Sequence, residues 1–245
     1  MLSSILRTTT SVVLLYHRMG LPKLSSLVAG QYVAPTLFRS QMDYLSSKGW
    51  AATNLDSVIS EELSDIDRFA ITFDDGYLSV YEHAYPAMVE RQMKATIYVV
   101  VDSIGGFNEW DRKAGDQSEQ MMSAAQIKEL SDAGFEIGSH TLTHPHLTEL
   151  NNSDLDRELV ESKSRLEDLI GREVKSFSYP YGNCDDRVIA AAIEAGYSNA
   201  VATRLGIVWK AGSFEIPRVN VRWNAFGPLL MKKIGRARRA SGVID

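Results

Sequence analysis

The chain has 245 residues, of which 44% are hydrophobic and 23% charged, and its formal net charge is −5. This is enough apolar material for one large α/β domain, and barrels often reach this length as a single domain. The acidic balance excludes the basic stripe of a nucleic-acid binder, and no run is apolar enough to span a membrane. The single cysteine, Cys184, excludes an internal disulfide and a cysteine-rich metal site.

Short apolar segments alternate with amphipathic segments along most of the chain. Runs of β-forming residues predict strands over residues 12–16, 50–53, 69–73, 95–101, 135–139, 174–178, 199–202 and 214–216. Apolar residues at helical spacing, bounded by proline, glycine or a capping box, predict helices within residues 35–49, 57–63, 78–92, 123–134, 153–170 and 185–195. Residues 19–34 and 105–120 are predicted loops, the second a candidate active-site loop.

The alternation of strand and helix repeats about seven times, which indicates a parallel sheet with crossover helices. A doubly wound sheet and a β/α barrel both fit this order. No glycine-rich phosphate loop follows a predicted strand, so a distorted (β/α) barrel of about seven parallel strands is favoured. We expect one domain over residues 1–245, with a basic C-terminal tail over residues 228–245 that is a solvated helix or contacts an anionic surface.

Side chains that could bind a metal or take part in catalysis follow the predicted strands at their C-terminal ends, namely His17, Asp74, Asp75, His140 and Tyr181. In a β/α barrel these ends meet at one face, where catalytic groups lie. Asp74 and Asp75 are adjacent carboxylates that repel each other, and a glycine follows them. They either form a turn, for which Asp-Gly is common, or share a cation or divide two chemical roles between them.

His140 and His144 are four residues apart. On a helical turn this spacing places both imidazoles on one face, within reach of one cation. One carboxylate from Asp74 and Asp75 would complete a set of two histidines and one aspartate with open positions for water and substrate. Each motif alone also fits an ordinary loop, but the two together at strand ends predict a divalent metal site.

Three segments resemble the motifs of the polysaccharide deacetylases, the family-four carbohydrate esterases. Residues 72–76 (Thr-Phe-Asp-Asp-Gly) and 140–144 (His-Thr-Leu-Thr-His) are similar to the first two motifs, and residues 178–182 (Ser-Tyr-Pro-Tyr-Gly) to the third. The resemblance runs from Tyr16 to Arg218 in the family's order, and its layout is similar to members that act on poly-N-acetylglucosamine. It implies a distorted β/α barrel and a deacetylase activity.

The resemblance also implies a role for each matching residue. Asp75, His140 and His144 would hold a divalent metal, usually zinc and sometimes cobalt or nickel. Asp74 would be the general base that takes a proton from the attacking water. The backbone N–H of Tyr181, together with the metal, would stabilise the oxyanion.

Two positions depart from the family pattern. Ser178 stands where an arginine usually steadies the base, and no histidine follows His146 to act as the usual late general acid. Arg218, which closes the last predicted strand, could steady Asp74 instead. His17 could supply the acid, because the first and last strands of a barrel are neighbours; the alternative is a buried structural histidine.

Candidate substrate contacts lie in the irregular loop and in the third motif. Trp110 could stack on a sugar face, and a plain hydrophobic anchor fits its context equally well. Tyr179 and Pro180 of the third motif are also predicted to contact substrate.

Three functions stay open at this point. The first is N-deacetylation of an N-acetylhexosamine polysaccharide, oligosaccharide or glycoconjugate, which the spare carboxylate of Asp74 favours. The second is O-acetyl ester or non-sugar amide hydrolysis at the same metal site, and the third is sugar binding without catalysis. The expected partner is an acetylated amino sugar and not nucleic acid, and the oligomeric state is left open. Without a recognisable signal peptide, a cytoplasmic location is expected, with peripheral membrane association as the alternative.

Overall fold

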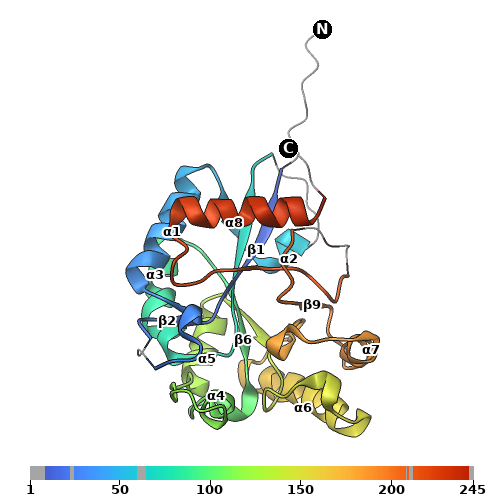
Figure 1. Cartoon of the computed structure of the whole chain (residues 1–245). Coiled ribbons are helices and arrows are strands. Elements are labelled where there is room, and N and C mark those ends of the chain that lie inside the picture. The colour runs from blue at the N-terminus through green and yellow to red at the C-terminus, as the bar shows by residue number, and fades with distance from the viewer. Residues whose placement is uncertain (1–8, 23–24, 60–64, 208, 210–211, 243–245) are drawn as a thin grey trace.

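Parallel strands form the centre of the molecule (Figure 1). The computed structural model describes residues 9–22, 25–59, 65–207, 209 and 212–242. Its main sheet has the strand order β10-β1-β5-β6-β7-β8-β9, and β4 pairs with the start of β5. The bounds are β1 Ser11–Tyr16, β4 Ala51–Thr53, β5 Arg68–Phe73, β6 Thr96–Val99, β7 Glu136–Ser139, β8 Ser176–Ser178, β9 Asn199–Val201 and β10 Val219–Asn220. The pairings between these described strands are parallel, as predicted.

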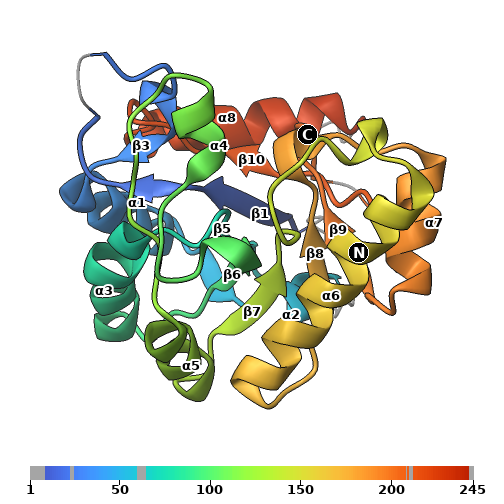
Figure 2. The same cartoon turned by 90° about the horizontal axis from the view of Figure 1, so that it is seen from below.

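The strand register brings the C-terminal ends together. Tyr16 of β1 lies opposite Phe73 of β5, and Val99 of β6 lies opposite Ser139 of β7. The residues that follow these strands therefore start from one edge of the sheet. Figure 2 shows the strands curling round a common centre with the helices outside them.

The sheet curls into a distorted barrel because one segment bonds to both of its ends. Ile216 donates its N–H to the Ala200 carbonyl (3.0 Å) and accepts the Ala202 N–H (2.8 Å), beside β9. Val221 donates its N–H to the Leu15 carbonyl (2.8 Å), and β10 pairs with β1. The first and last strands are therefore neighbours, as a barrel requires.

The last strand differs from the prediction. The expected strand over residues 214–216 makes one isolated bridge, between Val201 and Ile216, and the paired strand is β10. Pro217 lies between the two segments and has no N–H to donate, so the hydrogen-bond ladder is interrupted there.

Helices cover the outside of the barrel (Figures 1 and 2). Their bounds are α1 Pro35–Ser47, α2 Leu55–Ile59, α3 Tyr85–Glu90, α4 Glu109–Lys113, α5 Ala124–Asp132, α6 Asn152–Ile170, α7 Asp186–Glu194 and α8 Gly227–Ala240. The predicted capping box of α5 is present, because the Gln126 N–H and the Ser123 N–H each bond to the other residue's side chain. No helix in the described part of the chain combines the length and apolar composition needed to cross a bilayer.

The two predicted loops carry more structure than their sequences indicate. Within and just before the first loop, β2 (Arg18–Met19) pairs in parallel with β3 (Tyr32–Val33). The second loop contains α4, and an isolated bridge between Tyr77 and Met121 ties its end to the chain after β5. The first loop therefore has a two-stranded sheet of its own, and the second is attached to the body of the barrel.

The basic C-terminal segment forms α8, which packs across the barrel beside α1 (Figure 1). Leu230, Ile234 and Ala237 are buried on its inner face. A Cβ placed on Gly227 would lie 2.3 Å from the Tyr44 ring of α1, so the helices meet too closely there for a larger residue. The basic residues at the exposed positions are Lys232, Arg236 and Arg239.

Candidate active site

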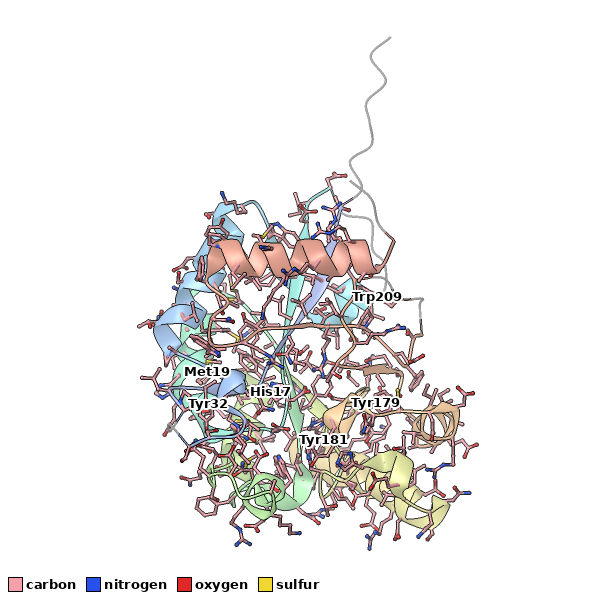
Figure 3. The ribbon with its side chains drawn as sticks, viewed as in Figure 1. His17, Met19, Tyr32, Tyr179, Tyr181 and Trp209 are labelled. Carbon is pink, nitrogen blue, oxygen red and sulfur yellow. The ribbon has the colours of Figure 1, made fainter. Side chains whose placement is uncertain are left out.

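A cavity of about 170 Å³ opens at the C-terminal ends of the strands. Its lining consists of His17, Val28, Gln31, Asp74, Asp75, Trp110, Asp111, His140, His144, Tyr181 and Thr203. Figure 3 places His17 and Tyr181 near the centre of the view, below α8. Seven of the ten predicted site residues therefore line one cavity, although they come from five separate parts of the chain.

Asp75, His140 and His144 form a compact group of metal-binding side chains. The Nε2 atoms of His140 and His144 lie 3.3 and 3.4 Å from Oδ1 of Asp75, and one ligand atom from each residue lies within 4.8 Å of the others. His140 Nδ1 contacts the Ser178 carbonyl at 2.7 Å, so Nδ1 carries the proton and Nε2 is free to bind a metal. Burial raises the pKa of Asp75, but hydrogen bonds from the two histidines hold that pKa well below its usual value. An ionised carboxylate and two imidazoles fit a divalent metal such as zinc.

The two histidines do not lie on a helical turn, contrary to the prediction. The residues between them form an irregular loop, in which Thr141 and His144 have left-handed φ angles of 71° and 62°. His144 donates its N–H to Thr141 Oγ1 at 3.0 Å, which closes the loop. The loop brings the imidazoles of His140 and His144 to a centroid distance of 4.9 Å without a helix.

Left-handed backbone is concentrated at this site. The described non-glycine residues with positive φ are Asp75, Gln92, Thr141, His144 and Tyr181. All except Gln92 belong to the cavity or to the loop between its two histidines. Each such residue costs about 1–3 kcal/mol and persists where the surrounding structure holds it in place, which is common at functional sites.

Arg218 holds Asp74 beside the metal-binding group. The two terminal nitrogens of Arg218 donate to Oδ1 and Oδ2 of Asp74, each at 2.7 Å, and both side chains are buried. Ser178 Oγ lies 3.2 Å from Oδ2 of Asp74 and donates to it. Burial raises the pKa of Asp74, but the charges of Arg218 and His140 and the hydrogen bonds from Arg218 together keep that pKa below its usual value. Asp74 is therefore ionised at neutral pH and is fixed at both oxygens.

His17 follows β1 and lines the cavity together with Asp74 and Asp75. Its Nδ1 atom is buried and has no hydrogen-bond partner within the described residues. Burial lowers the pKa of His17, and the nearby carboxylates of Asp75 and Asp74 oppose this effect without cancelling it. His17 is therefore a neutral imidazole at neutral pH, in a position to exchange protons within the cavity.

Aromatic side chains cover His144 from two directions. Trp110 of α4 stacks on the imidazole with ring centroids 4.4 Å apart, and Tyr181 meets it edge-on at 4.6 Å. The Tyr181 side chain is 46% exposed, so it lies at the mouth of the cavity. The Tyr181 N–H donates to no acceptor in the described part of the chain, which leaves it available to a ligand.

Tyr179 and Pro180 do not reach the cavity. Both side chains are buried, and Tyr179 packs in the core against Phe177 with ring centroids 5.1 Å apart. The structure thus places these two side chains away from the cavity lining, and their contact with substrate stays a prediction. Their part of the chain instead sets the backbone that leads into Tyr181.

The segment that carries the metal-binding group also matches a known family. Residues 64–200, more than half of the chain, match the model of the family described as polysaccharide deacetylase. The chain belongs to the polysaccharide deacetylase family. Asp74, Asp75 and both histidines of the metal-binding group lie inside the matched segment, whereas His17 and Arg218 lie outside it.

Individual members of the polysaccharide deacetylase family align with this chain over part of their length. The Bacillus subtilis protein YxkH is 32% identical over 152 residues, which are 62% of this chain and 50% of the relative. The poly-beta-1,6-N-acetyl-D-glucosamine N-deacetylase of Staphylococcus aureus is 25% identical over 174 residues, 66% of this chain and 57% of the relative. The chain therefore spans about half the length of these curated relatives.

Solved structures show the same fold. The Streptococcus pyogenes deacetylase PplD, solved in complex with acetate, superposes with a TM-score of 0.78 and is 23% identical. The match covers 92% of this chain and 98% of that one. The similarity extends over nearly the whole barrel, which confirms the predicted fold class.

A polar network that no sequence motif marks ties the loop over residues 105–120 of this deacetylase family member to the barrel. Arg18 is 1% exposed and donates to the hydroxyls of Tyr77 (2.5 Å) and Tyr32 (3.2 Å) and to the Asp111 carboxylate. Asp111 lines the cavity and follows Trp110 in α4. The network therefore helps to hold Trp110 over the site. In the sequence, the only sign of this network is that Arg18 directly follows His17. That sign is weak, because a basic residue in a loop is normally exposed.

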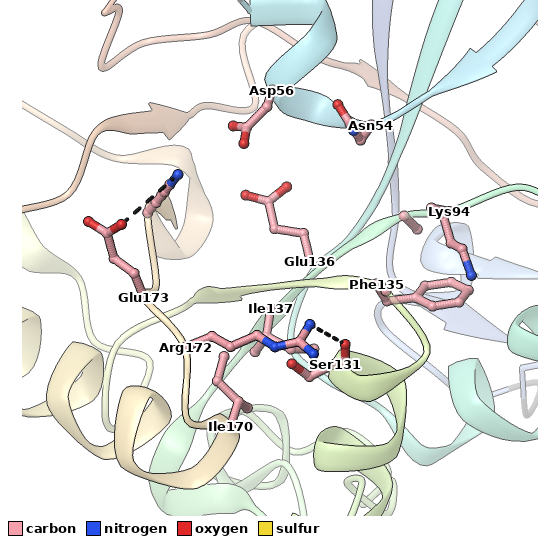
Figure 4. A pocket seen from close by; sticks show the side chains of 13 residues that line it. Asn54, Asp56, Lys94, Ser131, Phe135, Glu136, Ile137, Ile170, Arg172 and Glu173 are labelled. Atoms are coloured by element: carbon pink, nitrogen blue, oxygen red, sulfur yellow. Dashed lines mark hydrogen bonds and ion pairs between the residues drawn. The ribbon is translucent and has the colours of Figure 1, made fainter.

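A larger cavity, about 240 Å³, lies at the N-terminal ends of β6 and β7 (Figure 4). Glu136 points into it and accepts a 2.6 Å hydrogen bond from the Thr96 hydroxyl. Burial raises the pKa of Glu136 to about 7. The metal-binding group found among the described residues does not line this cavity. At the N-terminal face of a barrel, such residues usually contribute to stability.

Proposed function

We propose that the chain is a metal-dependent hydrolase that removes N-acetyl groups from an N-acetylhexosamine-containing polysaccharide, oligosaccharide or glycoconjugate. The observation that carries the proposal is the unequal pair of aspartates. Asp75 faces two histidine ligand atoms, whereas Asp74 is held by Arg218 and stays outside that group. A protein that merely bound sugar would not need this second, ionised carboxylate. The Staphylococcus aureus relative, which is named for an N-deacetylase activity on a polymer of N-acetylglucosamine, supports the choice of substrate.

Asp75, His140 and His144 would hold the metal, with zinc as the first candidate and cobalt or nickel as alternatives. Two nitrogen ligands and one oxygen ligand leave positions open for water and substrate. A divalent cation held there supplies Lewis acidity, which polarises a carbonyl and makes water a stronger nucleophile near neutral pH.

Asp74 would take the proton from the attacking water. Its two oxygens are fixed by Arg218, and Ser178 donates to one of them, so the carboxylate is oriented before substrate arrives. Because its pKa is below the usual value, Asp74 is ready to accept a proton at neutral pH. A carboxylate with a low pKa is a weak base. It contributes to catalysis because it is held close to the water, since a proton moves efficiently only over hydrogen-bond distance.

Tyr181 and His17 would complete the reaction. Tyr181 has a left-handed backbone conformation and lies at the cavity mouth. Its free N–H would donate to the oxyanion that forms on the acetyl group. His17 would hand a proton to the departing amine. Since His17 starts neutral, it must first acquire that proton within the site, and the neighbouring Asp74 is the residue that collects one.

Acetate release from N-acetylglucosamine oligomers tests the proposal. We expect release by the zinc-loaded protein, loss of release after removal of the metal by a chelator, and recovery when zinc is restored. Asp74→Asn should keep the metal and lose the release of acetate. If the metal-loaded protein releases no acetate from any acetylated amino sugar, the proposal is wrong.

A substrate panel separates the two alternatives. Faster release from O-acetylated sugars or from non-sugar amides than from N-acetylated sugars would assign the same site to ester or amide hydrolysis. Binding of the oligomers without turnover would instead assign a sugar-binding role.

A further inference from the structure

The loop between the two histidine ligands is held by a helix residue outside the cavity. Glu158 lies on α6 and is 3% exposed. Its Oε2 atom accepts the N–H of Leu142 at 2.8 Å and the N–H of Thr143 at 3.0 Å, and its Oε1 atom accepts the Thr143 hydroxyl at 2.6 Å. The carboxylate therefore binds the middle of the segment whose ends are His140 and His144.

The contacts of Glu158 identify the loop as its partner. No ion pair within the described residues joins Glu158 to a lysine, arginine or histidine. A buried carboxylate without a counterion is costly unless hydrogen bonds take up its charge. The three loop donors do so, and bonds to a charged acceptor are stronger than neutral ones. Glu158 thus couples the shape of the loop to the position of α6.

A second contact from the same helix holds the start of the loop. Ser162 hydrogen-bonds to Ser139 with an Oγ to Oγ distance of 2.9 Å, and Ser139 directly precedes His140. The Thr141 N–H also donates to Ser139 Oγ, at 3.2 Å. Glu158 and Ser162 are four residues apart, so they face the loop from one side of the helix. α6 therefore supports both the beginning and the middle of the loop.

The loop needs this support because its backbone is unusual. Thr141 and His144 adopt left-handed φ angles, which residues with bulky or β-branched side chains seldom do. Without Glu158, the N–H groups of buried Leu142 and exposed Thr143 would lose their acceptor, and the loop would relax towards common conformations. Such a relaxation would move His144 relative to His140.

We propose that Glu158 is a positioning residue for the metal site. It sets the separation of His140 and His144 and thereby raises the affinity of the site for a divalent metal. The inference rests on the metal site of the proposed function, but it concerns metal binding and not the reaction. Residues that support metal ligands in this way typically change metal affinity by about 10- to 100-fold when they are replaced.

The test titrates the metal-free protein with Zn²⁺ in competition with a chromophoric chelator, and records the absorption spectrum of the Co²⁺-loaded protein. For Glu158→Ala we expect the Kd for Zn²⁺ to rise about 10- to 100-fold, with a changed Co²⁺ spectrum. Glu158→Gln keeps a carbonyl acceptor for the loop N–H groups and should recover most of the affinity. Glu161→Gln makes the same chemical change at an exposed position of α6 and should match the wild type.

A purely structural role predicts a different outcome. In that case Glu158→Ala would lower the melting temperature, yet bind Zn²⁺ with wild-type affinity and show the wild-type Co²⁺ spectrum, and this result would overturn the inference. If Glu158→Ala does not fold, Glu158→Asp replaces it in the test, because the shorter side chain draws the carboxylate away from the loop. An unchanged Kd for Zn²⁺ in Glu158→Asp would also overturn the inference. Failure of the wild type to bind any divalent metal would count against the proposed function itself.

Discussion

Arg218 and Asp74 are 144 residues apart in the chain and form a two-point ion pair in the barrel, with both N···O distances at 2.7 Å. The segment before β10 brings the arginine beside β1, and Asp74 follows β5, the other neighbour of β1. Arg218 Nε also donates to the Ala202 carbonyl at 3.0 Å, which fixes the plane of the guanidinium. This pair orients one aspartate and leaves Asp75 to face the histidines.

Replacing Arg218 by lysine tests the two-point contact. Lysine keeps the positive charge, but it donates from a single nitrogen and cannot bind both oxygens of Asp74 in one plane. We expect kcat for acetate release to fall roughly 10- to 100-fold, while the metal content of the purified protein stays at the wild-type level. Arg222→Lys, at an exposed position, is the control. An unchanged kcat in Arg218→Lys would show that Asp74 does not need this orientation.

Replacing His17 by alanine tests the proton donor. The metal-binding group lies on other strands, so the metal content should be unaffected, whereas the leaving amine would lose its proton source. We expect turnover to fall by roughly 100-fold or more, with little change in KM. His83→Ala removes an exposed histidine and should behave as the wild type. Near-normal turnover in His17→Ala would show that His17 is a structural residue and not the proton donor.

Replacing Asp111 by asparagine tests the network around Arg18. The change leaves the buried guanidinium of Arg18 without its carboxylate, although the hydroxyls of Tyr32 and Tyr77 remain. We expect a loss of about 2 kcal/mol in the free energy of unfolding, measured by chemical denaturation, and a higher KM because Trp110 loses its support.

Glu109→Gln is the matched control for this experiment, since Glu109 lies on the same helix and forms an exposed ion pair with Arg112. Such pairs contribute little, so its stability should stay close to that of the wild type. Equal stability of Asp111→Asn and Glu109→Gln would contradict a structural role for the Arg18 network.

Replacing Glu136 by glutamine tests the buried carboxyl at the other end of the barrel. Burial raises the pKa of Glu136 from 4.5 to about 7 in the folded protein. Between these values the unfolded chain ionises while the folded one does not, so the wild type loses stability as pH rises from about 4.5 to about 7. Glutamine does not ionise. We therefore expect Glu136→Gln to gain about 2 kcal/mol over the wild type between pH 5 and pH 8.

Thermal unfolding across this pH range measures the effect. Glu173→Gln, a substitution at an exposed position of the same cavity, is the matched control and should unfold close to the wild type. A constant difference between Glu136→Gln and the wild type would show that Glu136 ionises normally in the folded protein.

Much of the fold follows from short-range patterns. The capping box of α5, the proline at the start of α1 and the glycine that ends α6 each mark a boundary through contacts within a few residues. The two aspartates after β5 and the histidine pair after β7 are likewise local motifs. Their placement at strand ends was enough to predict one metal site, because the C-terminal ends of parallel strands share one edge.

Other parts of the site depend on contacts between distant segments. Whether Arg218 reaches Asp74 depends on the closure of the barrel through β10. Pro217 interrupts the run of β-forming residues before that strand, so the sequence pattern does not predict it. The burial of Arg18 likewise results from packing against a loop whose Asp111 is 93 residues away, and Glu158 is buried against a loop whose Leu142 is 16 residues away. A residue's own neighbours cannot specify such contacts, since strand order and register decide which distant groups meet. Local sequence thus predicted the aspartates and histidines of the candidate site, and the tertiary structure decided which distant residues hold them in place.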